Sequence, residues 1–340
     1  MMTLKHLIRT TRLGTLLLIL TLFAVYPLHA QVKVILDTDI GGDADDLGAV
    51  SMLHNLMDQG ECEVLAFISW SIEEYAVPAL DALNRYYNHP DIPIATRKSE
   101  DMGYIEWNYN HIVATNLGYK LGYHDVPDAV ELYRKILQEN KDSSIVIVTV
   151  GPLKNIMDLI NSEPDSISPL GGRELIQSKV KEFVIMGGKF PQGEWEWNFS
   201  GHMPGVTEYV LEHLNVPITF SGYELGVTIK TGAVFNECPE DHPLYLGYFH
   251  FSNNASWMKE YFKGEILDNS SYDQTAVLYA VRKGLSTYWT KVSGGTCVAD
   301  SSGGNTWIPD RDSGHSYLVL HEDKEKMAAI LEALMIGDKN

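Results

Sequence analysis

The sequence predicts an α/β fold with a mainly parallel, doubly wound sheet that is flanked by helices and followed by a mixed C-terminal elaboration. Three observations support this class. Apolar stretches typical of strands alternate with helix-like stretches from residue 32 to about residue 235, and this alternation favours parallel strands joined by crossover helices. Five aspartates gather directly after the first strand, where open α/β sheets bind ligands. Beyond about residue 236 the regular alternation ends.

The expected elements follow in order from an apolar, β-prone first strand. The stretch 144–150 is almost continuous in Val and Ile, as in a strand buried on both faces, whereas Pro78 interrupts an otherwise helical stretch. We expect strands at residues 32–36, 62–70, 91–95, 144–150, 181–186 and 216–220. We expect helices at 47–57, 73–87, 125–139, 153–160, 204–214, 244–262, 273–282 and 324–335, with short β-like pieces in the Gly-, Ser- and Thr-rich segment 286–320.

Composition points to one large globular domain at residues 31–340. The chain has 340 residues, of which 45% are hydrophobic, and this is enough for a sizeable core. The formal net charge is −19, and residues 1–30 hold three cations and no acid, so the remainder carries −22. Nucleic acids and anionic membrane surfaces favour basic partners. The acidic body therefore argues against both, whereas a neutral nucleoside or sugar would not be repelled.

Residues 1–30 have the pattern of an export signal. Lys5, Arg9 and Arg12 precede an apolar stretch, 13–25, and a cleavage point follows Ala30. The alternative is an uncleaved anchor, but the apolar stretch is shorter than the roughly 20 residues that a membrane span needs. We therefore expect an exported protein, periplasmic or secreted, without a stable membrane anchor.

The three cysteines leave the disulfide pattern open. Cys62, Cys238 and Cys297 are odd in number and lack the spacing of a metal site. One disulfide with one remaining thiol and three cysteines without a disulfide are both compatible with the sequence.

The acidic run after the first strand is the strongest chemical signal. It contains Asp37, Asp39, Asp43, Asp45 and Asp46. Packing so many carboxylates together is unfavourable unless a cation offsets the repulsion, and a hard divalent metal prefers oxygen ligands. The alternative is a solvated acidic helix start, and we interpret Asp43 as a helix N-cap rather than a site residue. The run lacks the final Glu of an EF-hand.

This acidic run resembles the signature of the nucleoside hydrolases of the inosine/uridine-preferring type. Four later segments resemble further motifs of that family, and all five occur in the family's order between about residues 32 and 282. These segments are 148–155 (VTVGPLKN), 184–188 (VIMGG), 196–199 (EWNF) and 272–273 (YD). The segments 270–276 and 196–199 also resemble an exported nucleoside hydrolase-like subgroup.

The resemblance implies a nucleoside hydrolase-like fold and a calcium-dependent hydrolase. Such an enzyme cleaves the N-glycosidic bond of ribonucleosides or related ribosyl compounds, so its partner is a small-molecule nucleoside. The resemblance assigns Ca²⁺ to Asp39, Asp46, Asp273 and the carbonyl of Val150, and Asp39 also accepts a proton from the metal-bound water. Family members are often dimers or tetramers, which suggests a homo-oligomer by analogy.

The resemblance also implies a sugar site beside the metal. Carboxylates around the ribose ring would stabilise the positive charge that develops on the sugar as the glycosidic bond breaks. Asp37 would support the acidic loop. The implied substrate-binding residues are Asp45, Met186, Glu196, Asn198 and Asp273.

The chain departs from the family pattern on the side of the leaving base. Tyr272 stands where some members carry a histidine that protonates the base, and two expected asparagines are missing near 69–72 and 190–195. Candidates for this side, as stacking surfaces, hydrogen-bond donors or ordinary packing residues, are Trp70, Trp195, Trp197 and Tyr272. Further candidate acids, each also explained as a surface or loop residue, are His202, Glu194 and Glu224.

Three other functions remain open at this point. The chain could hydrolyse another glycoside with a cis-diol, or bind a sugar or nucleoside with calcium and without catalysis. The pair Asp37 and Asp39 after a strand also fits a haloacid dehalogenase-type phosphatase. The sequence disfavours this last function, because Ile40, Gly41 and Gly42 do not supply the Thr that this chemistry needs.

Overall fold

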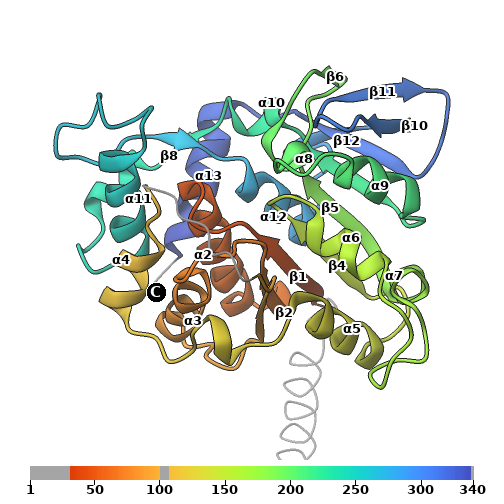
Figure 1. Cartoon of the computed structure of the whole chain (residues 1–340). Helices are drawn as coiled ribbons and strands as arrows, with labels where there is room; N and C mark the ends of the chain where they lie inside the picture. The colour runs from red at the N-terminus through yellow and green to blue at the C-terminus, as the bar shows by residue number, and fades with distance from the viewer. Residues whose placement is uncertain (1–30, 100–106, 338–340) are drawn as a thin grey trace, which may run out of the picture. The chain divides into compact units, whose positions relative to one another are not determined.

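A ten-stranded sheet forms the centre of the described part of the chain (Figure 1). The computed structural model describes residues 31–99 and 107–337, so the predicted export signal at 1–30 lies outside the described residues. The strand order is β3-β2-β1-β4-β5-β7-β12-β10-β11-β6. The pairs from β3 to β12 are parallel, whereas the pairs from β12 to β6 are antiparallel. The predicted α/β class is therefore confirmed.

Six of the seven parallel strands agree with the predicted ones to within a few residues, whereas the last lies in the segment 286–320, where only short β-like pieces were expected. Their carboxyl ends share one edge of the sheet, because parallel neighbours run in the same direction. They are β1 (Val32–Thr38), β2 (Cys62–Ser69), β3 (Ile94–Thr96), β4 (Ile145–Thr149), β5 (Val180–Met186), β7 (Ile218–Ser221) and β12 (His315–Leu320).

The predicted C-terminal elaboration belongs largely to the same sheet. The segment that was expected to contain short β-like pieces forms three strands, which are β12 itself, β10 (Trp289–Ala299) and β11 (Asn305–Pro309). A short strand from the middle of the chain, β6 (Gln192–Gly193), pairs with β11 at the edge. A separate antiparallel pair joins β8 (Lys230–Thr231) to β9 (Asn269–Ser270).

Helices cover both faces of the sheet, each over its own hydrophobic core. Side chains along β1 alternate between the two cores, since Val34 and Leu36 join one and Ile35 the other. The first core packs against α2 (Ala44–Asp58), α3 (Ala76–Tyr86), α4 (Asn110–Leu117), α11 (Pro243–Asn254), α12 (Asp273–Arg282) and α13 (Lys324–Ile336). The second packs against α5 (Ala129–Glu139), α6 (Lys154–Ile160), α7 (Gly172–Lys179) and α9 (Val206–His213). This arrangement is a doubly wound sheet.

Several predicted helix boundaries are wrong for identifiable reasons. The helix expected at 244–262 ends at Asn254, because Ala255 has an extended backbone (ψ 129°). The helix expected at 73–87 begins only at Ala76, which places Pro78 in the first turn, where its missing N–H has no intrahelical partner to lose. Part of the helix expected at 125–139 is a 3₁₀ turn, η1 (Tyr123–Asp125), and α5 begins after Asp128. Helices α4 and α7 were not predicted.

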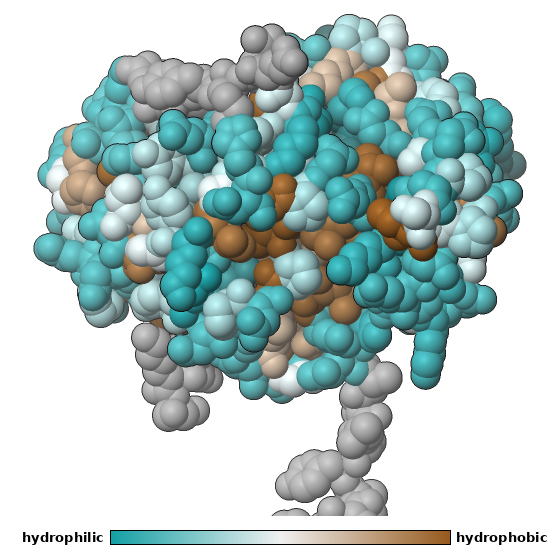
Figure 2. Space-filling view, turned by 60° about the horizontal axis from the view of Figure 1, so that its bottom comes forward, coloured by the Kyte–Doolittle hydropathy of each residue, from teal (hydrophilic) through white to brown (hydrophobic). Residues whose placement is uncertain are grey.

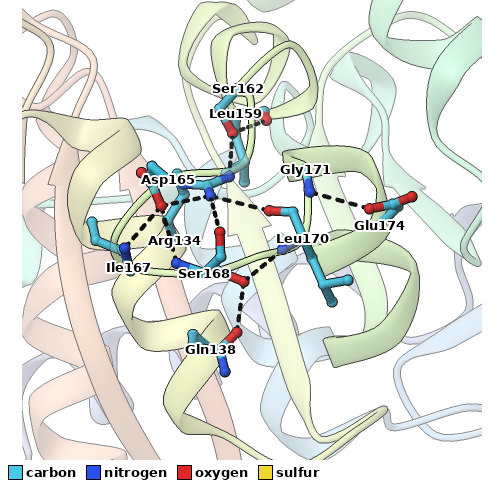
Figure 3. A network of polar contacts seen from close by, with 10 residues as sticks. All are labelled: Arg134, Gln138, Leu159, Ser162, Asp165, Ile167, Ser168, Leu170, Gly171 and Glu174. Carbon is cyan, nitrogen blue, oxygen red and sulfur yellow. Dashed lines mark hydrogen bonds and ion pairs between the residues drawn. The ribbon is translucent and has the colours of Figure 1, made fainter.

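A buried arginine fixes the connection between α6 and α7 (Figure 3). Arg134 is 2% exposed and forms a two-pronged ion pair with Asp165, with N–O distances of 2.9 and 2.8 Å. It also donates to the hydroxyl of Ser162 and to the carbonyls of Ser168 and Leu170. The network therefore holds a loop that contains no predicted site residue.

The surface and the cysteines add two observations. Most of the face shown in Figure 2 is hydrophilic around a central hydrophobic area, in keeping with the acidic composition. None of the helices among the described residues has the length and apolar character needed to cross a membrane. No disulfide joins Cys62, Cys238 and Cys297, all of which lie within the described residues.

Candidate functional site

The candidate site lies at the point where the strand order reverses. Strand β1 has β2 on one side and β4 on the other, so the crossovers leave this point in opposite directions. Ligands of open α/β sheets bind outside the carboxyl ends of the strands at such a point. Here Asp39 follows β1 and Val150 follows β4. The two ends are tied together, because the N–H of Val150 donates to the carbonyl of Asp37 over 2.8 Å.

A tight turn brings the acidic run from β1 into α2. Gly41 has φ +104°, and an added Cβ there would lie 2.4 Å from the amide nitrogen of Asn110, so only glycine fits. The hydroxyl of Tyr109 accepts from the N–H of Gly41 and donates to the carbonyl of Asp43. Asp43 is the N-cap of α2, as predicted, but it also lines the cavity, so the prediction that it is not a site residue is wrong. The turn therefore places Asp45 in the first turn of the helix, at the edge of the cavity.

Three carboxylates from opposite ends of the sequence meet here. Oxygens of Asp45, Asp46 and Asp273 lie within 4.8 Å of one another. Helix α12 begins at Asp273, and one carboxylate oxygen of Asp45 accepts the N–H groups of Tyr272 and Asp273 over 3.0 and 3.1 Å. Thr38 donates its hydroxyl to Asp46. The early acidic run and the late Tyr-Asp pair are therefore held together directly. We refer to Asp45, Asp46 and Asp273 as the acid triad.

The acid triad is in an unfavourable state without a counter-cation. Each of its members is at most 3% exposed. Burial raises the pKa of Asp45, Asp46 and Asp273 well above the usual range of a carboxyl, and the neighbouring carboxylates raise it further. A bound divalent cation would offset this repulsion, and hard oxygen donors are what calcium prefers. The donor set therefore fits a hard divalent cation.

Asp39 lines the same cavity without belonging to the acid triad. Burial raises its pKa to about 6, although the indole N–H of Trp197 donates to its Oδ2 over 3.1 Å and lowers it. The resemblance assigned the metal to Asp39, Asp46, Asp273 and Val150, whereas the closest carboxylates include Asp45 instead of Asp39.

The two residues of the Glu-x-Asn motif connect strand ends near the cavity. Glu196 caps the short helix α8 (Trp197–Ser200) and accepts three backbone N–H groups, from Gly188, Asn198 and Phe199, over 2.9–3.0 Å. The side-chain amide of Asn198 donates to the carbonyls of Val150 and Met186 over 3.0 and 3.2 Å. All four predicted residues Val150, Met186, Glu196 and Asn198 therefore lie at the cavity.

Aromatic side chains form the rest of the cavity wall. The cavity has a volume of about 640 Å³ and is lined by five of the seven tryptophans of the chain. The predicted residues among its aromatic lining are Trp70, Trp195, Trp197 and Tyr272. Trp107, Lys189 and Trp257 also line the cavity, and no sequence pattern marked them. Tyr223, next to the candidate acid Glu224, lines it as well.

The remaining candidate residues differ in whether they line the cavity. His202 lines the cavity as an exposed residue whose ring contacts Trp197 edge-on. Glu194 and Glu224 are not part of the lining. Asp37 is buried beneath the loop, where it accepts hydrogen bonds from Tyr133 and Asn155, and burial raises its pKa to about 7. These contacts tie the end of β1 to α5 and α6.

Comparisons with known proteins agree on one family. A sequence model described as inosine-uridine preferring nucleoside hydrolase matches residues 34–334. The pyrimidine-specific ribonucleoside hydrolase RihA of Escherichia coli O1:K1 is 32% identical over 101 residues, a match that spans 28% of each protein.

Solved structures of two nucleoside hydrolases share the fold. The plant nucleoside hydrolase PpNRh1 has a TM-score of 0.65 at 18% identity, over 89% of this chain and 98% of its own. The inosine-uridine preferring nucleoside hydrolase of Bacillus anthracis has a TM-score of 0.63 at 14% identity, again over 89% and 98%.

Proposed function

The chain belongs to the inosine-uridine preferring nucleoside hydrolase family, and from this premise we propose that it hydrolyses the N-glycosidic bond of ribonucleosides or related ribosyl compounds with calcium. The observation that carries the proposal is the contact between Asp273 and the early acids Asp45 and Asp46 inside an aromatic-lined cavity. Such a cavity offers oxygen ligands at one place and flat apolar surfaces at another. A ribonucleoside has a matching polar diol and a planar base.

Calcium would be held by Asp39, Asp46 and Asp273 with the carbonyl of Val150, and Asp45 is close enough to join them. When bound, calcium supplies ligand positions for sugar hydroxyls and lowers the pKa of the water that it holds. The buried carboxylates also stabilise positive charge on the sugar ring as the C1′–N bond breaks.

Asp39 is the general base of the proposed reaction. A base works best when its pKa lies near the working pH, and burial brings the pKa of Asp39 to about 6. The indole N–H of Trp197 holds one oxygen of this carboxylate over 3.1 Å. Asp39 can therefore accept a proton from the attacking water while its orientation stays fixed.

The sugar is bound by the residues around the ends of β4 and β5. Asn198 is fixed by its bonds to Val150 and Met186, and Glu196 by three backbone N–H groups. This fixation reduces the rearrangement needed when the substrate binds. The rest of the cavity wall consists of the aspartates, Gly42, Val150, Met186 and tryptophan, tyrosine, lysine, histidine and serine side chains.

Export is the second part of the proposal. It is supported by the positive, apolar and cleavage regions within residues 1–30. An exported enzyme of this kind would act on ribosyl compounds outside the cytoplasm. Comparison of the N-terminus of the protein purified from the source cell with the gene sequence tests this part, since a start at Gln31 is expected.

Release of free base tests the enzymatic proposal. The purified protein is mixed with calcium and a panel of purine and pyrimidine ribonucleosides, and base and reducing sugar are measured. We expect release that a chelator abolishes and that Asp39→Asn lowers by at least about 100-fold, as for loss of a general base. Asp91→Asn is the matched control, because Asp91 is exposed and its replacement removes the same charge.

Other outcomes would replace the proposal. Tight ribose binding with no release in the presence of calcium would indicate a binding protein. Release only from glycosides without a base would indicate another cis-diol glycoside as substrate. Activity only on phosphate monoesters would contradict the proposal outright.

A further inference from the structure

Lys189 is a fixed cation in the wall of the cavity. It follows β5, and its backbone is held on both sides by Asn305, which accepts its N–H and donates to its carbonyl, both over 2.8 Å. Its aliphatic stem packs against Gly193, where an added Cβ would lie 2.5 Å from the Cβ of Lys189. Asn305 is 3% exposed. The backbone of Lys189 is therefore held by a buried side chain, and its stem lies against Gly193.

The ammonium group lies on the aromatic side of the cavity. The Nζ of Lys189 is 4.6 Å from the ring centroid of Tyr223, within cation–π distance. The Tyr223 ring in turn stacks on Tyr272, with centroids 5.4 Å apart and an interplanar angle of 25°. The N–H of Tyr223 also donates to the carbonyl of Gly188 over 2.9 Å. This stack connects the cation to Tyr272, which directly precedes an acid-triad member.

No carboxylate neutralises this cation by direct contact. Among the described residues, no ion pair joins Lys189 to an Asp or Glu. Glu224 is attracted to it at longer range, but one oxygen of Glu224 is bonded to the N–H of Phe190. A structural lysine in an acidic cavity would be expected to form an ion pair. Lys189 instead lines a cavity that a substrate would fill, where its N–H donors can bind that substrate.

We propose that Lys189 is the proton donor to the departing base, which is an inference that rests on the proposed nucleoside hydrolysis. The C1′–N bond breaks and its electron pair goes to the base nitrogen, which takes a proton from the ammonium of Lys189. Lys189 becomes a neutral amine and is reprotonated from solvent. The attacking water forms the new C1′–O bond and gives its proton to Asp39, so atoms and charges balance.

The proposal explains how the chain can lack the histidine that, by the resemblance, some family members carry beside the late aspartate. Tyr272 stands at that position and serves as a stacking partner of Tyr223. The exposed His202 also lines the cavity, so it is the competing donor. The two candidates are separable, because a leaving-group acid matters only when the leaving group needs a proton.

The test compares nucleosides with an activated riboside. 4-Nitrophenyl β-D-ribofuranoside releases a stable anion and needs no acid, whereas inosine and uridine need one. We expect Lys189→Met to lower kcat on the nucleosides by about 100-fold, the lower range for loss of a general acid, and to change the nitrophenyl rate less than about 3-fold. Lys189→Arg should be equally slow on nucleosides, because a guanidinium does not give up its proton.

Two controls complete the experiment. Lys181→Met removes the same charge from an exposed position on β5 and should leave both rates unchanged. His202→Gln should also leave the ratio of the two rates unchanged. Thermal unfolding of each variant, with and without calcium, shows whether it is folded.

The outcomes that would overturn the role of Lys189 are specific. Equal loss on both substrates, wild-type nucleoside rates in Lys189→Met or Lys189→Arg, or a leaving-group-dependent loss in His202→Gln would each do so. If the wild-type protein hydrolyses neither substrate, the proposed function itself fails. The two failures are thus distinguishable.

Discussion

Replacing Asp273 by Asn should stabilise the metal-free protein and remove its response to calcium. In the acid triad, two ionised carboxylates at 4.8 Å repel each other by about 3.5 kcal/mol at an effective dielectric constant of about 20. Asp273 takes part in two such pairs. Protonation limits the actual penalty, so we expect Asp273→Asn to raise the free energy of unfolding by about 2 kcal/mol or more at pH 7.5 without metal.

The same physics fixes the sign of the pH dependence. The pKa values of Asp45, Asp46 and Asp273 are raised in the folded protein. The contribution of these carboxyl groups to the free energy of unfolding is therefore fully present below their unfolded pKa, near 3.8. It is lost as the pH rises through their folded pKa. Metal-free protein should lose up to about 1.4 kcal/mol per pH unit for each such group. Asp273→Asn should reduce this slope.

Calcium should offset the repulsion among the acid-triad carboxylates, and so stabilise the protein, in the wild type only. At about one hundred times its Kd, calcium adds about 2.7 kcal/mol to the free energy of unfolding. The assay is urea unfolding at pH 5, 6.5 and 8, with chelator or calcium, on wild type, Asp273→Asn and the exposed control Asp91→Asn. A metal-free Asp273→Asn that is less stable than wild type, or that keeps the full calcium response, would refute the reasoning.

Two further changes test separate parts of the structure. Arg134→Met removes a buried arginine with five hydrogen bonds and should lower the free energy of unfolding by about 3 kcal/mol in urea while leaving calcium affinity unchanged; a weaker calcium affinity would contradict the separation of this loop from the site. Trp197→Phe removes the N–H that donates to Asp39, so the acidic limb of the pH–rate profile should move up by about one pH unit; an unshifted limb would exclude Asp39 as the titrating base.

The sequence was sufficient for the parallel half of the fold and for one side of the site. Its apolar stretches located the parallel strands β1 to β5 and β7, because strands buried on both faces carry few charged residues. The C-terminal strands were less predictable. Strand β12 is parallel to β7 whereas β10 and β11 are antiparallel, and partner choice between distant segments depends on packing rather than on local pattern.

The site, like the fold, was only partly predictable from the sequence. The acidic run was evident from spacing, but the placing of Asp273 beside it came only from resemblance, since about 230 residues separate the two segments. Lys189 and Trp257 line the cavity from loops or helix ends that carry no motif. Their participation depends on the relative placement of β5, α8 and α11, which periodicity does not reveal. The helix boundary at Asn254 was missed for a similar reason.

Locating a cation by diffraction is the most direct test of the account. Crystals grown with calcium would be measured at a wavelength where calcium scatters anomalously. We expect a single strong peak within about 2.6 Å of oxygens of Asp46 and Asp273 and of the Val150 carbonyl, with Asp39 or Asp45 completing the carboxylate ligands. Absence of the peak at saturating calcium, or its appearance away from Asp273, would contradict the central claim.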